Sequence, residues 1–422
     1  MGFFSRNNFF KTVKSLNHNV KLVFAFSFLQ SVGRGIWMGN ILSSYIFLIT
    51  NESNELLGLT SAATGVAMTM TVLPAGYFSD RFPRDRILKG ASIVGFIGLV
   101  CALLATDIVM IFVALLFWGL FQGMNRPSLE AIFADSVESG TRSKAYAWNH
   151  LIRQIAMASG PFVNIVLFIF LGDIWEIQIL KIVMVFGLII SMSSLLIMLR
   201  FDDKKSLGIA SEHLDLEYTP DSDQNNFLSR PSLVIIITLL ISNLVIGFGA
   251  GMTVKFFPIF FMKQYSLTPI PVQLIMGMTS VITGLTSIYT QKHSLKRGRA
   301  EMIFLVQGIA TVCLFIISFY PPIFVLIPIF LTRGSLMNAS QPLSRSILMD
   351  VVPKRNRGKI NSLETLAWGM FWNFSAAIGG FLIGSNNNFR LCFIVTTCLY
   401  VIGTLLILII IPLVAKEKPR TV

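Results

Sequence analysis

Twelve stretches of this chain are almost wholly apolar and are separated by short polar breaks. Each stretch reaches or approaches the ~20 residues that a helix needs to cross ~30 Å of hydrocarbon. Unbroken apolar runs exclude the alternating pattern of a membrane β-barrel, so the pattern predicts membrane-spanning α-helices. The expected spans are 22–49, 56–79, 87–105, 108–129, 144–171, 177–199, 232–262, 268–290, 300–319, 322–345, 358–384 and 389–414.

The composition supports an integral, multi-pass membrane protein whose first partner is the lipid bilayer. Hydrophobic residues make up 54% of the chain and charged residues only 13%, which excludes a soluble domain of this length. The net charge is +13, but the basic residues are scattered between apolar stretches, so no nucleic-acid partner is expected. The four cysteines lie inside apolar stretches without metal-ligand spacing, and we expect no metal and no cofactor.

The sequence lacks the motifs of ATP-driven and catalytic proteins. No G-x-x-x-x-G-K-[ST] loop occurs, which excludes an ATP-driven pump. No Ser-His-Asp or other nucleophile constellation is found either. The chain is therefore not expected to be an enzyme.

Lysine and arginine concentrate in alternate loops, which predicts the orientation. The basic loops fall within 81–89, 142–144, 204–205, 292–299 and 354–359, and the tail after 415 is basic too. Because cytoplasmic loops carry the excess of Lys and Arg, both termini are predicted to be cytoplasmic, with an even number of spans.

Residues 201–230 form a polar, acidic segment with few apolar side chains. This composition predicts a cytoplasmic linker. It divides the chain into an N-terminal six-helix bundle, 1–200, and a C-terminal six-helix bundle, 231–422.

The two halves are repeats of each other. A shift of 215 residues without gaps aligns identical residues at the end of the fourth span and in the loop after it. These pairs include Gly119 with Gly334, Pro127 with Pro342, Asp135 with Asp350, Arg142 with Arg357 and Lys144 with Lys359. A repeat in the same orientation predicts two bundles related by an axis along the membrane normal.

The loop between the second and third spans reads Gly76-x-x-x-Asp80-Arg81-x-x-Arg84. With this motif, twelve spans in a 6+6 arrangement and a long central loop, the chain resembles the major facilitator superfamily. The resemblance covers essentially the whole chain and implies an all-α secondary transporter that works by alternating access. Pro83 stands where that family usually has Gly, and the matching second-half loop lacks the Asp, so a one-sided latch is predicted.

The resemblance implies that this loop is a conformational latch. Asp80, at the end of its helix, would accept hydrogen bonds from the N-terminal amides of another helix, and Arg84 would pair with an acid near the fourth span. The available acids are Glu130 and Asp135. Gly76 and Arg81 complete the motif. The alternative is that these charges only fix the membrane topology.

Polar residues within the spans are the candidates for substrate binding. Arg34 lies half way along the first span, with Asn40 beyond it. Arg333 lies half way along the tenth span, Asn338 follows about one turn later, and Lys255 lies in the seventh span. In the resembled family the first, fourth, seventh and tenth helices line a central cavity, so the three cations would converge there.

The positive sign of these residues favours an organic anion as substrate, since guanidinium groups bind carboxylate and phosphate. A neutral solute such as a sugar, or a drug, is the alternative cargo. For the residues themselves, Arg34 pairing with a carbonyl and Lys255 extending towards the interface are the structural alternatives. The sequence leaves open whether transport of the small-molecule substrate is coupled to a proton or counter-ion.

A second polar cluster, His150, Arg153 and Gln154, lies in the fifth span at helical spacing. It is a candidate inner gate, with hydrogen bonding to helix ends as the alternative. A different class of function also stays open, in which a protein of this fold senses a ligand or handles lipids without transporting a solute.

Overall fold

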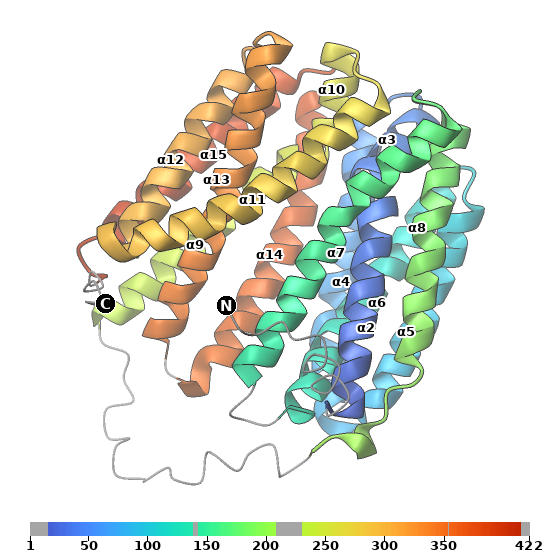
Figure 1. The fold of residues 1–422 in the computed structure, drawn as a ribbon, viewed down its shortest axis with the longest axis vertical. Helices are drawn as coiled ribbons and strands as arrows, with labels where there is room; N and C mark the ends of the chain where they lie inside the picture. Colours follow the sequence, from blue (N-terminus) through green and yellow to red (C-terminus); the bar gives the residue numbers. More distant parts are fainter. Residues whose placement is uncertain (1–15, 138–141, 208–229, 353, 415–422) are drawn as a thin grey trace, which may run out of the picture. The chain divides into compact units, whose positions relative to one another are not determined.

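The computed structural model describes residues 16–137, 142–207, 230–352 and 354–414, without the side chains of 80, 142–144, 349 and 354–368. Within these residues the chain is helical and contains no strand (Figure 1). The first half contains α2 (His18–Trp37), α3 (Asn40–Ile49), α4 (Asn54–Arg81), α5 (Arg84–Leu104), α6 (Ile108–Asp135), α7 (Arg142–Leu171), α8 (Ile177–Met198) and the short 3₁₀ turn η2 (Asp203–Lys205). The second half contains α9 (Arg230–Val254), α10 (Phe257–Tyr265), α11 (Pro269–Arg297), α12 (Arg299–Ile317), α13 (Ile323–Val351), α14 (Lys354–Ile383) and α15 (Phe389–Ile410).

Ten helices in the described residues are long and apolar enough to cross a membrane. Helices are the outcome expected for such runs, because backbone groups in hydrocarbon must find their hydrogen bonds within their own segment. The all-α, multi-pass membrane fold is thereby confirmed. The count of twelve spans and the cytoplasmic position of the termini stay predictions.

Two of the predicted spans are not continuous helices. The span 22–49 is divided into α2 and α3 at Gly39, whose φ of +83° lies in the left-handed region that favours glycine. The span 232–262 is divided into α9 and α10, and Pro258 stands in the first turn of α10, where a proline needs no backbone N–H. Each of these two predicted spans therefore contains two helices.

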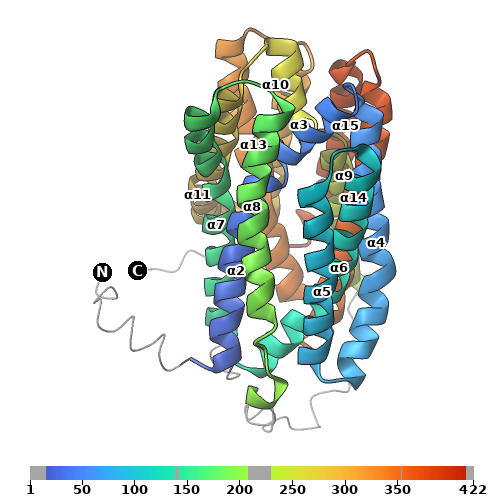
Figure 2. The same ribbon diagram turned by 90° about the vertical axis from the view of Figure 1, so that its right-hand side faces the viewer.

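The described residues form two compact units, and each is considered by itself. Unit 1 comprises the described residues within Met1–Met38, Val66–Gly160 and Ile182–Ser222. In it α5 packs along α6 (Figure 2). The Trp37 ring of α2 contacts the Trp118 ring of α6, with 5.3 Å between centroids. The indole Nε1 of Trp37 donates a hydrogen bond to Ser191 Oγ of α8 at 3.0 Å.

Unit 2 comprises the described residues within Gly39–Gly65, Pro161–Lys181 and Asp223–Val422. An apolar cluster in it joins α9, α12, α13 and α15 through buried side chains that include Leu239, Ile303, Val306, Ile347 and Ile407. Two segments from the first 200 residues therefore pack with the helices after residue 230. The units differ from the predicted bundles 1–200 and 231–422, and that division, which rests on the sequence repeat, stays a prediction.

Polar contacts fix those two segments within unit 2. Asn54 at the start of α4 donates from Nδ2 to the carbonyl of Gly384 and to Asn387 Oδ1, both at 2.9 Å. Asp173, after α7, accepts from the backbone N–H of Ile270 at 2.7 Å. This carboxylate therefore lies at the N-terminus of α11, where a helix favours negative charge.

Candidate functional site

Arg126 on α6 and Arg153 on α7 face each other within unit 1. The two helices run in opposite directions, because only residues 136–141 connect them. The rings of Phe133 and Tyr146 are in contact, with 4.8 Å between centroids. Arg126 is seven residues before Phe133 and Arg153 is seven residues after Tyr146. Seven residues make about two helical turns, so both arginines return to the facing sides at the same level.

Arg34 on α2 joins these two residues, and we name the three arginines the basic cluster. Two ring contacts, Trp37 with Trp118 and Phe24 with Phe133, set the register of α2 against α6. By that register Arg126 is level with residue 30 of α2. Arg34 therefore lies about four residues, or ~6 Å, further along the helix axis. Its guanidinium group is repelled by those of both other arginines, which shows that the three charges are within electrostatic reach.

Glycines allow α2 to lie this close to its neighbours. At Gly160 of α7 an added Cβ would be 2.1 Å from the carbonyl carbon of Gly35, the residue after Arg34. At Gly33 an added Cβ would be 2.3 Å from Ser191 Oγ of α8. Small residues let backbones approach in a membrane, where apolar surface alone does not drive helices together.

The positive charge of the basic cluster is only partly compensated. Arg34 and Arg126 are half-buried and Arg153 is exposed. The Nε atom of Arg34 is buried and has no hydrogen-bond partner. None of the ion pairs found in the described residues includes a member of the cluster. The exposed carboxylate of Glu130 attracts Arg126 from one turn away on α6. A half-buried cation without a full counter-charge costs free energy.

The predicted cations of the second half lie in unit 2 and have partners there. Arg333 is only 5% exposed, and its Nη2 donates to the hydroxyl of Tyr400 at 2.8 Å. Its guanidinium also stacks over the Phe257 ring at 4.9 Å from the centroid. Lys255 donates from Nζ to the hydroxyl of Ser61. These contacts favour packing roles as much as ligand binding.

The two predicted amides differ in their surroundings. Asn40 donates from Nδ2 to Gln273 Oε1 at 3.4 Å, within unit 2. Asn338 is exposed and donates to the carbonyl of Gly334 in its own helix at 2.8 Å. The structure thus divides the predicted substrate residues, with Arg34 in unit 1 and the other four in unit 2. Their role in binding stays a prediction.

In the predicted latch, Arg84 at the start of α5 forms an ion pair with Asp135 at the end of α6. The side chains are 24% and 35% exposed. Asp135 is therefore the acid that pairs with Arg84 here, while Glu130 lies exposed one turn earlier. Arg81 is exposed and stacks over the Tyr77 ring at 4.3 Å.

The other two positions of the motif, Gly76 and Asp80, give no evidence for or against the latch. Gly76 has open space around it, since a Cβ there would meet no atom within 4 Å. The side chain of Asp80 lies outside the described residues.

The second half contains the equivalent ion pair, which the sequence reasoning missed. Arg299 Nη1 lies 2.5 Å from Asp350 Oδ2, and it also donates to Ser346 Oγ at 3.1 Å. Arg299 and Asp350 stand 215 residues after Arg84 and Asp135. The expectation of a one-sided device is wrong for this ion pair, although the loop before Arg299 does lack the Asp.

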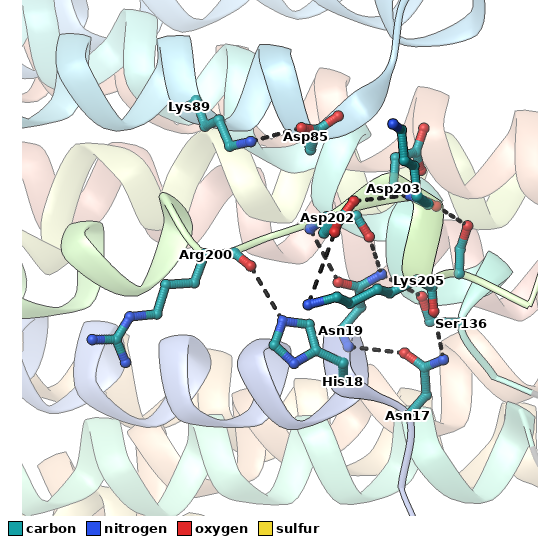
Figure 3. Close-up of polar contacts among 12 residues, drawn as sticks. Asn17, His18, Asn19, Asp85, Lys89, Ser136, Arg200, Asp202, Asp203 and Lys205 are labelled. Carbon is teal, nitrogen blue, oxygen red and sulfur yellow. Dashed lines mark hydrogen bonds and ion pairs between the residues drawn. The ribbon is translucent and has the colours of Figure 1, made fainter.

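The start of the predicted linker is bound to unit 1 (Figure 3). Asn17 Nδ2 donates to the carbonyl of Lys205 at 2.7 Å. Asn19 Nδ2 donates to the carbonyl of Asp202 at 2.9 Å and to Ser136 Oγ at 3.2 Å. Asp203 Oδ2 accepts from the backbone N–H of Arg84 at 3.3 Å. Residues up to 207 are thus part of the unit, and most of the predicted linker 201–230 lies outside the described residues.

The three candidates for an inner gate are exposed on α7. Arg153 belongs to the basic cluster, which gives it a second interpretation. His150 lies one turn before Arg153, and Gln154 follows Arg153 in the sequence. The gating role of these residues stays a prediction.

These features define a class, the multi-pass helical membrane proteins with a charged loop whose ion pair occurs in both halves of the chain. The sequence matches the family model of the Major Facilitator Superfamily over residues 23–363 and 239–422, so the chain belongs to this family. No match is found among curated protein sequences.

Solved structures of transporters share the fold. A bacterial homologue of the human lysosomal transporter Spinster, inward-facing and occupied, is 13% identical, with 96% of this chain and 98% of that chain covered and a TM-score of 0.70. The nucleoside transporter NupG is 11% identical, with 93% and 98% covered and a TM-score of 0.67. A bacterial homologue of the iron transporter ferroportin, inward-facing, is 12% identical, with 92% and 98% covered and a TM-score of 0.66. At these identities the likeness establishes the fold alone.

Proposed function

We propose that this protein is a secondary transporter that moves an organic anion across a membrane by alternating access. Membership of the Major Facilitator Superfamily and the transport proteins among its structural neighbours support a transporter rather than an enzyme. The basic cluster is the observation that carries the choice of an anion. A neutral sugar or a cationic drug would leave the charge of these three arginines uncompensated.

The cluster acts by binding the negative group of the substrate. Guanidinium groups present fixed forks of N–H donors to carboxylate or phosphate oxygens. Binding relieves the repulsion among the arginines, so occupied and empty forms differ in electrostatic energy. A ligand shifts a conformational equilibrium only through such a difference. The ion pairs Arg84–Asp135 and Arg299–Asp350 add small, separable contributions to the same equilibrium.

The first experiment is a thermal-shift screen of the purified protein against organic anions, sugars, amines and lipids. A ligand that binds only the folded state raises the unfolding midpoint. We expect anions to raise it, Arg34→Ala to abolish the effect, and Arg34→Lys to retain part of it. Arg200→Ala is the matched control, because that side chain is exposed and the hydrogen bonds found for this residue in the described part of the chain involve its backbone, with His18 and Ile197. Equal responses from all variants would refute the assignment.

Arg333 and Lys255 are tested in the same assay as the second predicted pair. If Arg333→Ala folds but no longer responds to the anion, it belongs to the substrate site. If it unfolds at lower temperature with unchanged affinity, its contacts with Tyr400 and Phe257 are its main role. Flux into proteoliposomes, with and without a pH gradient, then separates transport from ligand sensing and proton coupling from uniport.

A further inference from the structure

The net charge of the basic cluster limits what can neutralise it. Arg34, Arg126 and Arg153 contribute three positive charges, and Glu130 is the acid that acts on Arg126. The sum is a charge of plus two. A single carboxylate would leave one cation uncompensated in or near the hydrocarbon region, which is costly.

The arrangement of the three arginines favours one compact group over two separated ones. Arg126 and Arg153 stand at the same level on facing helices, as the Phe133–Tyr146 contact fixes. A group that all three arginines contact needs oxygens that point in at least three directions. A phosphate monoester has three free oxygens that do not lie in one plane with the phosphorus, whereas a carboxylate has only two oxygens, in one plane. Arg34, ~6 Å further along the axis, is within the length of its own side chain of the same group.

We infer that the basic cluster binds a tetrahedral oxyanion with two negative charges, the chemistry of a phosphate monoester. Arg126 and Arg153 bracket the group from two sides, and Arg34 binds it from the other end of the cluster. The inference rests on the proposed anion transport and specifies its substrate class. It also gives Arg126 a binding role that the sequence did not reveal.

The test measures ligand affinity by thermal shift in an uncharged detergent, with defined probes. Methyl phosphate, sulfate, acetate and succinate represent a titrating dianion, a permanent dianion, a monocarboxylate and a dicarboxylate. A phosphate monoester loses its second charge below its second pKa of about 6. We therefore expect the affinity for methyl phosphate to be at least about tenfold higher at about pH 7.5 than at about pH 5, while sulfate binds at both pH values.

Sulfate also controls for titration of the protein itself. His150 is exposed on α7 one turn before Arg153. Its protonation would strengthen the binding of any anion at low pH, which is opposite to the expected loss for methyl phosphate. Protonation of Glu130 would likewise strengthen the binding of any anion.

Variants connect the binding to the cluster. We expect Arg126→Gln and Arg153→Gln each to weaken methyl phosphate and sulfate about tenfold or more, while Arg200→Gln has no effect. If Arg126→Gln does not fold, Arg126→Lys is used. Lysine keeps the charge but loses the fork, so an intermediate affinity is expected.

The outcomes separate this inference from the proposed function. Acetate or succinate binding as tightly as methyl phosphate through Arg34 would overturn the tetrahedral dianion and leave anion transport standing. Binding of sugars or amines but of no anion would overturn both. Lysophosphatidic acid is added as a final probe, because a phosphate group can come from a lipid. Tighter binding than methyl phosphate, lost in the same variants, would assign the phosphate to a lipid headgroup.

Discussion

Replacing Gly160 with alanine tests how closely α2 and α7 must approach for the basic cluster to form. The Cβ of an alanine at this position would lie 2.1 Å from the carbonyl carbon and 2.2 Å from the carbonyl oxygen of Gly35. Ordinary van der Waals contact begins at 3.4 Å. The obstacle is backbone, which no rotamer change removes. The two helices therefore have to separate by about 1 Å along this contact.

The magnitude follows from two opposing effects. Overpacking in a well-packed interior costs about 1–3 kcal/mol. Glycine to alanine within a helix otherwise gains about 0.5–1 kcal/mol, because glycine has the greater conformational freedom to lose. We expect a net loss of about 1–2 kcal/mol in the free energy of unfolding. Arg34 is next to Gly35, and Arg153 lies about two turns before Gly160 on α7. We therefore expect the separation to weaken anion binding as well.

Thermal unfolding of purified Gly160→Ala, with and without methyl phosphate, measures both effects. Gly90→Ala is the matched control in the same unit. Gly90 lies within α5, and an added Cβ there meets only Met124 Cε at 3.8 Å, so this variant should unfold at the same or a higher temperature than the parent. A midpoint for Gly160→Ala as high as that of Gly90→Ala would refute the close approach of α2 and α7.

Three further predictions concern contacts away from the cluster. A double-mutant cycle of Arg84→Ala and Asp135→Ala should give a coupling energy below about 1 kcal/mol, because both side chains are partly exposed; a coupling of several kcal/mol would contradict this. Asp173→Ala should lower the free energy of unfolding by about 1 kcal/mol, since the carboxylate accepts from Ile270 N–H at the start of α11, and Asp173→Asn should retain part of it. Burial, with a smaller effect of a neighbouring tyrosine, raises the pKa of Tyr265 to about 12. Its contribution to stability should therefore be complete below pH ~10 and lost as the pH rises to ~12. The absorbance difference between the parent and Tyr265→Phe should show tyrosinate appearing near pH 12, and a midpoint near pH 10 would contradict it.

The membrane helices could be predicted from sequence because hydrophobicity alone decides whether a segment enters the bilayer. The breaks within them could not. Gly39 and Pro258 are the residues at which the first and seventh spans divide, yet glycine and proline also occur inside continuous helices here, as Pro74 does in α4. Which of them interrupts a helix depends on tertiary contacts that the local sequence does not contain.

The site was only partly predictable. Arg34 was recognisable because a charge at the middle of an apolar run has to be explained. Arg126 was overlooked because the predicted fourth span ends at 129, and a charge near a span end normally reaches the headgroups. In the structure α6 continues to Asp135, which places Arg126 well inside the helix. The convergence of Arg126 with Arg153 rests on the register between α6 and α7, which one sequence cannot supply.

The two halves of the repeat share the loop ion pair but not the basic cluster, and this difference bears on function. At the 215-residue shift the loop ion pair is present twice, as Arg84–Asp135 and Arg299–Asp350. The positions that match the three arginines of the basic cluster hold Gly249, Gln341 and Trp368. An ion pair that adjusts the equilibrium between two conformations can serve each half in the same way, so it is expected in both halves. A binding site needs its charges only once, because a second cluster of like charge would add cost without a second ligand. This difference is what we expect if the cluster is the proposed substrate site and the ion pairs are shared parts of the conformational mechanism.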